Sequence, residues 1–126
     1  MNIKVSMIEI SNSIKKNIIM KYFRFVQIGD LDNLLELFDE DIIIYEPFSK
    51  IKKGLKGKQN ITSFLKIAIF STKDMRYDLK FESINNNLNS VLVRYKKNGE
   101  KNFKFNFKFV SLNRIVKIKS IEIIIL

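Results

Sequence analysis

The sequence predicts one α+β domain, in which helices near the start of the chain pack on a mainly antiparallel sheet built by the second half. In the first half, apolar residues recur every three or four positions, the spacing of amphipathic helices. After residue 75 they alternate with polar residues, as half-buried strands do. At 126 residues the chain has the size of one domain with one core. The expected order of elements is α-α-β-α-β-β-β-β.

The domain is expected to cover residues 11–126, preceded by an extension over residues 1–10. The extension mixes Lys4 and Glu9 among apolar residues and has no continuous apolar stretch, so it does not read as a signal peptide. No apolar run approaches the roughly 20 residues that a membrane-spanning helix needs. We therefore expect a cytoplasmic protein without a membrane partner.

A pair of helices is expected at the start of the domain. The first, from Ser11 to Val26, has its apolar stripe at Ile14, Ile18, Ile19, Tyr22, Phe23 and Val26. Gly29 breaks the pattern, and Asp30 can cap a second, short helix. The apolar face of that second helix is expected to be Leu31, Leu34, Leu35 and Phe38.

A strand and a third helix follow. The β-branched run from Ile42 to Ile44 predicts a strand, which the only proline, Pro47, terminates. Residues 49–58 contain five lysines and two glycines and predict a basic loop. This loop is either an anion-attracting mouth or, as we favour, a solvated connection. The third helix is predicted by the spacing of Ile61, Phe64, Leu65, Ala68 and Ile69.

The remainder of the chain is rich in strands. Four are expected, over residues 76–84, 90–97, 101–111 and 114–125. Asn98–Gly99 is a strong signal for a two-residue hairpin. From Phe103 to Phe109 phenylalanines alternate strictly with polar residues, so one face of that strand must be buried. The apolar parity of the last strand changes near Ser120, which either a bulge or burial of both faces in a dimer would explain.

Composition limits the chemistry. The chain has neither cysteine nor histidine, which excludes Ser-His-Asp and Cys-His centres and the usual zinc ligands. Carboxylates, tyrosine and lysine remain for acid–base work. The one acidic cluster, Asp39 to Asp41, reads as solvated residues after a helix, so no metal or other cofactor is expected. The net charge of +10 comes from lysines scattered over every segment, so no specific nucleic acid is expected as a partner.

The chain resembles a known superfamily over the stretch from Tyr22 to Phe64, which reads YFRFVQIGDLDNLLELFDEDIIIYEPFSKIKKGLKGKQNITSF. This stretch is similar to the N-terminal half of the ketosteroid isomerases and SnoaL-like proteins of the NTF2-like superfamily. The matching features are Gly29–Asp30, Phe38–Asp41, Glu46–Pro47, Gly57 and the closing phrase NRIVKIKSIEI, residues 113–123. The resemblance implies an NTF2-like (cystatin-like) cone, with three N-terminal helices on a strongly curved mixed or antiparallel sheet.

The resemblance also implies site residues. Tyr22 corresponds to the tyrosine with which ketosteroid isomerases donate a hydrogen bond to the substrate oxyanion, and Glu46 to their proton-shuttling aspartate. Their second oxyanion donor, an aspartate, corresponds to Phe105, which can donate nothing. Loss of one such donor costs on the order of a hundredfold in rate. The chain is therefore a candidate isomerase with a glutamate base and one oxyanion donor absent.

Strand alternation supports an inward Glu46, because it shares the parity of Ile42 and Ile44. We expect burial to raise the pKa of Glu46 toward the range of a general base. The expected ligand wall is Phe48, Phe64, Tyr95, Phe105 and Phe107. The alternatives are that Tyr22 is only a core residue, that Glu46 is a surface carboxylate, and that the eleven phenylalanines fill the interior.

Three functions follow as hypotheses. The first is a domain that encloses a small hydrophobic molecule, with proton transfer by Glu46 and hydrogen-bond donation by Tyr22. The second is a non-catalytic module of the same fold, used for ligand binding or for homodimerisation through the sheet face. The third, electrostatic binding of nucleic acid, rests on charge alone.

Overall fold

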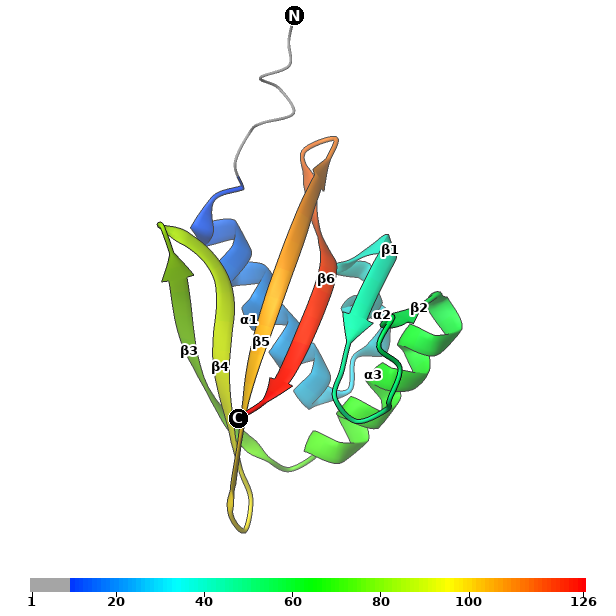
Figure 1. Ribbon diagram of the computed structural model, residues 1–126, viewed down its shortest axis with the longest axis vertical. Coiled ribbons are helices and arrows are strands. Elements are labelled where there is room, and N and C mark those ends of the chain that lie inside the picture. Colours follow the sequence, from blue (N-terminus) through cyan, green and yellow to red (C-terminus); the bar gives the residue numbers. More distant parts are fainter. Residues whose placement is uncertain (1–9) are drawn as a thin grey trace, which may run out of the picture.

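The computed structural model describes residues 10–126, so the predicted extension lies outside the described residues except for Ile10. Three helices and six strands follow one another in this part of the chain (Figure 1). They are α1 (Asn12–Ile28), α2 (Leu31–Glu36), β1 (Phe38–Tyr45), β2 (Leu55–Lys56), α3 (Lys58–Thr72), β3 (Arg76–Ile84), β4 (Asn87–Lys96), β5 (Glu100–Leu112) and β6 (Ile115–Ile125). None of these helices is long and apolar enough to cross a membrane.

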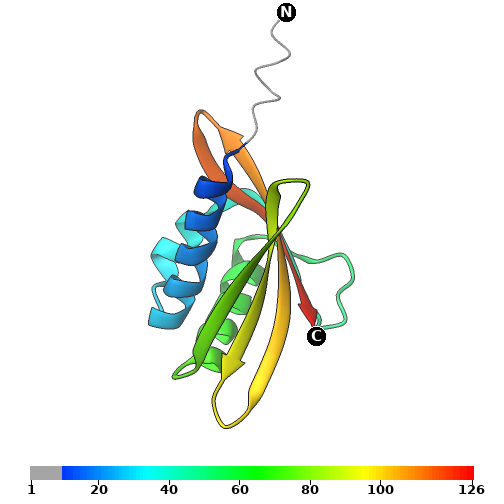
Figure 2. The ribbon, with the colours of Figure 1, turned by 90° about the vertical axis from the view of Figure 1, so that its left-hand side faces the viewer.

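The strands form one mixed sheet in the order β2-β1-β6-β5-β4-β3. Strands β1 and β6 are parallel, and every other neighbouring pair is antiparallel. The helices lie together on one face of this sheet (Figures 1 and 2). The predicted α+β class and helix–strand order are confirmed, with one strand added.

The joint between the first two helices forms as the sequence predicts. Ser11 caps α1 by accepting a hydrogen bond from the Ile14 amide at 3.2 Å. Gly29 ends α1 with φ at 73°, a left-handed conformation that glycine adopts without steric cost. Asp30 then caps α2 through the Asn33 amide at 3.3 Å. The turn lets α2 pack against α1, which also contacts α3.

Two local predictions are wrong. Phe38 is not part of the second helix, which ends at Glu36, but begins β1. Phe38 follows Leu34 and Leu35 at helical spacing, which predicts a helix residue. In the structure it lies in a strand, and its ring is part of the hydrophobic core. The basic loop contains β2, whose two residues pair with Ile43 and Ile44. A two-residue strand has no periodicity by which a sequence could reveal it.

Of the two explanations for the parity change near Ser120, the structure has the bulge. Lys108 pairs with Ser120 whereas Phe109 pairs with Ile118, so Lys119 has no partner on β5. The extra residue brings Ile118 and Ile121, which have opposite parity, onto the same side, and both are fully buried.

The opposite, helix-free face of the sheet is mainly polar. On it, Ser90 donates a hydrogen bond to the Asn106 side chain at 2.6 Å, and Asn106 donates one to Glu122 at 2.8 Å. Lys104, on the same face, approaches Glu82 at 3.9 Å. These contacts link β3, β4, β5 and β6 within one chain. A homodimer formed through this face stays a prediction.

Candidate functional site

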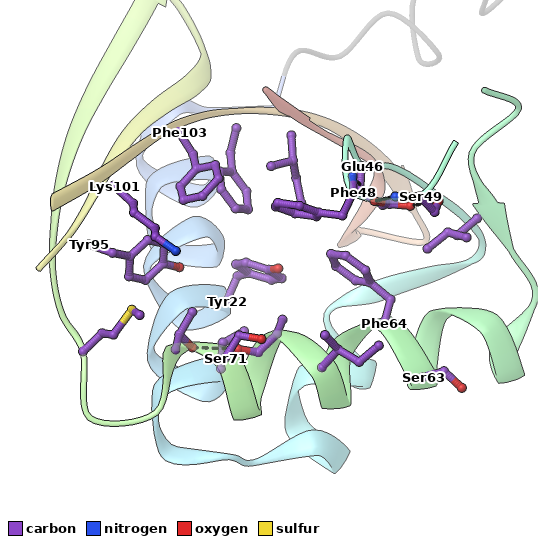
Figure 3. A pocket seen from close by; sticks show the side chains of 18 of the residues that line it. Tyr22, Glu46, Phe48, Ser49, Ser63, Phe64, Ser71, Tyr95, Lys101 and Phe103 are labelled. Carbon is purple, nitrogen blue, oxygen red and sulfur yellow. Dashed lines mark hydrogen bonds between the residues drawn. The ribbon is translucent and has the colours of Figure 1, made fainter. Parts of the chain in front are cut away.

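A cavity of about 690 Å³ lies between α3, α1 and the inner face of the sheet (Figure 3). Its volume falls in the usual range for small-molecule sites, about 300–1,000 Å³. The segment after β1 and the loop after α3 form further parts of its wall. The alternative in which phenylalanines fill the interior is therefore wrong.

The sequence of α3 explains why this space is open. The helix turns one stripe toward the cavity, and beyond Phe64 and Ile67 that stripe carries the small residues Ala68, Ser71 and Thr72. The large residues Ile61 and Leu65 are fully buried against the core instead. Because these side chains are small, the phenylalanines of β5 do not fill the space between α3 and the sheet.

Tyr22 reaches the cavity from the buried stripe of α1 and is only 2% exposed. Its ring contacts four aromatic rings, with centroids at 5.0 to 6.3 Å; they belong to Phe23, Phe38, Phe105 and Phe107. No described residue hydrogen-bonds to its hydroxyl, and no fully buried side-chain oxygen or nitrogen in the described chain lacks a partner. The hydroxyl must therefore face the open volume.

The Tyr22 hydroxyl is a donor at neutral pH. Burial raises the pKa of Tyr22, and the nearby phenol of Tyr95 raises it further. The phenol consequently keeps its proton and can donate a hydrogen bond to an acceptor that enters the cavity.

Glu46 also lines the cavity, as its shared parity with Ile42 and Ile44 predicts. Its carboxylate, however, is already engaged. It accepts hydrogen bonds from the backbone amides of Phe48, at 2.6 Å, and Ser49, at 2.9 Å, and from the Ser49 hydroxyl. These bonds fold the segment after Pro47 back on the end of β1.

The expectation that burial would raise the pKa of Glu46 is wrong. Burial acts in that direction, but the hydrogen bonds from Ser49 and Phe48 outweigh it, and the pKa lies below the usual value. Hydrogen bonds to the charged form stabilise the carboxylate and make it a weaker base. In this conformation Glu46 acts as a structural anion that holds a loop.

The remaining predicted site residues divide into two groups. Phe48, Phe64 and Tyr95 line the cavity together with Tyr22 and Glu46 (Figure 3). Phe105 lines it as well. Phe107 does not. It is 1% exposed and stacks between Phe105 and Phe109, with centroids at 6.1 and 6.3 Å, deeper in the core. Phe107 supports the wall without forming part of its surface.

The sequence analysis missed one charged residue at the site, Lys101. It lines the cavity and pairs in register with Tyr95 across β4 and β5. Its odd number matches that of Phe103 and Phe105, which both face inward, so the alternation of the strand already contained the signal. Within residues 10–126 no group of acidic side chains lies close enough together to hold a metal ion.

No protein-family model matches the sequence, and no curated protein matches it. Solved structures do match. One is a SnoaL-like protein of unknown function from Burkholderia thailandensis E264, with a TM-score of 0.71, 14% identity, and coverage of 94% of this chain and 99% of that one. Another is an NTF2-like protein of unknown function from Pseudomonas putida KT2440, with a TM-score of 0.67, 11% identity, and coverage of 88% and 83%.

A third similar structure is an epoxide hydrolase/cyclase-like enzyme in pyran ring formation of the polyether salinomycin. Its TM-score is 0.59 at 19% identity, with coverage of 93% of this chain and 95% of that one. The chain thus has the NTF2-like fold. At these identities the likeness shows the fold and leaves function to be argued from the site.

Proposed function

We propose that this protein binds a small, largely apolar molecule in the cavity, and that the Tyr22 hydroxyl donates a hydrogen bond to a polar atom of that molecule. The observation that carries the proposal is an unpartnered hydroxyl facing an open cavity whose wall is mostly apolar. Because the hydroxyl faces open volume, it can donate to water or to a ligand. A ligand that supplies an acceptor gains the net value of one hydrogen bond, about 0.5–1.5 kcal/mol.

The size of the ligand follows from the volume. At about 30 Å³ per water-sized group, a cavity of about 690 Å³ accommodates on the order of twenty non-hydrogen atoms. Aromatic walls from Phe64, Phe103 and Phe105 favour a flat or extended hydrocarbon body.

A neutral fluorescent probe tests the proposal directly. N-phenyl-1-naphthylamine should brighten on binding, and 1-decanol should displace it. Ala68→Phe, which fills the cavity from α3, should abolish both effects. The matched control is Lys66→Phe, because Lys66 is exposed on the same helix and does not line the cavity. Equal binding by the two variants, each shown to be folded by circular dichroism, would contradict the proposal.

Proton transfer is the second candidate function, because Glu46 and Tyr22 line one cavity as a carboxylate and a hydrogen-bond donor. Against this chemistry, the hydrogen bonds that Glu46 accepts from Ser49 and Phe48 lower its pKa and make it a weaker base. Deuterium exchange beside the carbonyl of 2-decanone, followed by NMR in D₂O, tests it. Exchange faster than in buffer, and lost in Glu46→Gln, would favour an enzyme over a binding protein.

A further inference from the structure

One end of the cavity carries a cation and a phenol side by side. Tyr95 and Lys101 are direct partners in the β4–β5 register, so their side chains leave the sheet on the same face. Both line the cavity, and Figure 3 shows both extending into it from the same side. Tyr95 is 9% exposed, whereas Lys101 lies at the exposed rim.

The charge on Lys101 is not neutralised within the described chain. It forms no ion pair there, because the neighbouring acid, Glu100, lies near Arg94 at 3.6 Å instead. Among the described residues that line the cavity, Glu46 is the other charged one, and its oxygens accept hydrogen bonds from its own loop. The cavity therefore offers a ligand an ammonium group that no described carboxylate pairs with.

The Tyr95 hydroxyl beside the Lys101 ammonium is a hydrogen-bond donor. No described residue hydrogen-bonds to the Tyr95 hydroxyl, which must face open volume for the same reason as that of Tyr22. Burial raises the pKa of Tyr95, and the nearby phenol of Tyr77 raises it further, so the hydroxyl keeps its proton. A group that fits here must accept hydrogen bonds and carry negative charge.

We propose that the ligand is an amphipathic carboxylate. Its head group meets the Lys101 ammonium and the Tyr95 hydroxyl, and its hydrocarbon body lies on Phe103 and Phe105, one and two positions further along the inward face of β5. This assignment rests on the proposed function, since it specifies the ligand class of the same cavity. It adds that the positive end of the cavity selects an anion over a neutral molecule of equal length.

The expected preference is moderate, because Lys101 is exposed to water. An ion pair at a solvated rim, assisted by one phenol hydrogen bond, should favour the anion about threefold to tenfold. Without the ammonium the preference should reverse, since moving a carboxylate out of water is more costly than moving a hydroxyl. Salt should weaken the preference, because the pair is not shielded from solvent.

The test compares decanoate with 1-decanol as competitors of N-phenyl-1-naphthylamine at pH 7.5. In the unmodified protein decanoate should bind at least threefold more tightly than 1-decanol. In Lys101→Met the ratio should fall to one or below. The matched control is Lys104→Met, on the same strand but on the outer face near Glu82, which should keep the ratio.

Three outcomes overturn the assignment. If 1-decanol binds as tightly as decanoate, the proposed function stands and the anion preference is refuted. If Lys104→Met lowers the ratio as much as Lys101→Met, the preference comes from the net charge of +10 and not from this site. If neither competitor displaces the probe, the proposed function fails together with the assignment.

Discussion

Replacement of Tyr22 by phenylalanine should weaken ligand binding without weakening the fold. The substitution removes one oxygen and leaves the ring, which is held by four aromatic neighbours. Most buried tyrosines lose a hydrogen bond in this exchange and are destabilised. In this protein the hydroxyl has no partner among the described residues, so no protein–protein hydrogen bond is lost.

The magnitudes follow from that geometry. The free energy of unfolding should stay within about 0.5 kcal/mol of the original value, because the hydroxyl faces open volume and its removal breaks no hydrogen bond with a described residue. The affinity for 1-decanol should fall about fivefold to tenfold, equivalent to about 1–1.4 kcal/mol for one hydrogen bond. Tyr22→Ala, which removes the ring as well, should lower the stability by about 3–5 kcal/mol.

Urea denaturation followed by circular dichroism measures the stability, and displacement of N-phenyl-1-naphthylamine measures the binding. For the reasoning to hold, Tyr22→Phe must bind 1-decanol more weakly while its stability stays nearly unchanged. A loss of more than about 1 kcal/mol of stability in Tyr22→Phe would mean that the hydroxyl has an acceptor within the protein. An unchanged affinity would mean that the hydroxyl does not face the ligand.

Three further changes test other parts of the structure, each by urea denaturation. Glu46→Gln should lower stability at pH 7 by about 0.5–1 kcal/mol, because the carboxylate is partly exposed and solvent screens its hydrogen bonds. Because the folded-state pKa of Glu46 is lowered, this difference should be present above the unfolded-state pKa and vanish as the pH falls through the folded-state pKa. Phe107→Ala should cost about 3–5 kcal/mol yet leave 1-decanol affinity of the folded protein within about twofold, since the ring does not line the cavity. Gly54→Ala should lower the free energy of unfolding more than Gly29→Ala does. Both glycines have positive φ, but only at Gly54 would an added Cβ come within 2.6 Å of the Ile43 side chain. Equal losses of stability would mean that the backbone conformation alone sets the cost.

The fold was predictable where the sequence carries a period or a turn signal. The stripe that includes Tyr22, the Gly29–Asp30 joint and the alternating phenylalanines each predict their element, and all are present. The bulge at Lys119 was also predictable, because the apolar residues on either side of it change parity. In each case local spacing alone determines which side of an element is buried.

The site was predictable only in part, for a physical reason. Parity places Glu46 and Tyr95 on the inner face, but it says nothing of what their polar atoms contact. The hydrogen bonds from Ser49 that lower the pKa of Glu46 depend on how the chain turns after Pro47. The volume of the cavity depends likewise on how far α3 stands from the sheet, which β2 helps to set through its pairing with β1.

The state of one carboxylate decides between a binding protein and an enzyme of this fold. A ligand-binding cavity needs Glu46 only to hold the loop that follows β1, and Glu46 accepts the backbone hydrogen bonds of that loop. A base needs an oxygen that is free to accept a proton and a pKa near neutrality. The hydrogen bonds lower that pKa, so a binding role accounts for every hydrogen bond that Glu46 accepts, and the depressed pKa makes Glu46 a weak base in this conformation. Ligand-bound protein in which the Ser49 hydroxyl has left Glu46 would reverse this ranking.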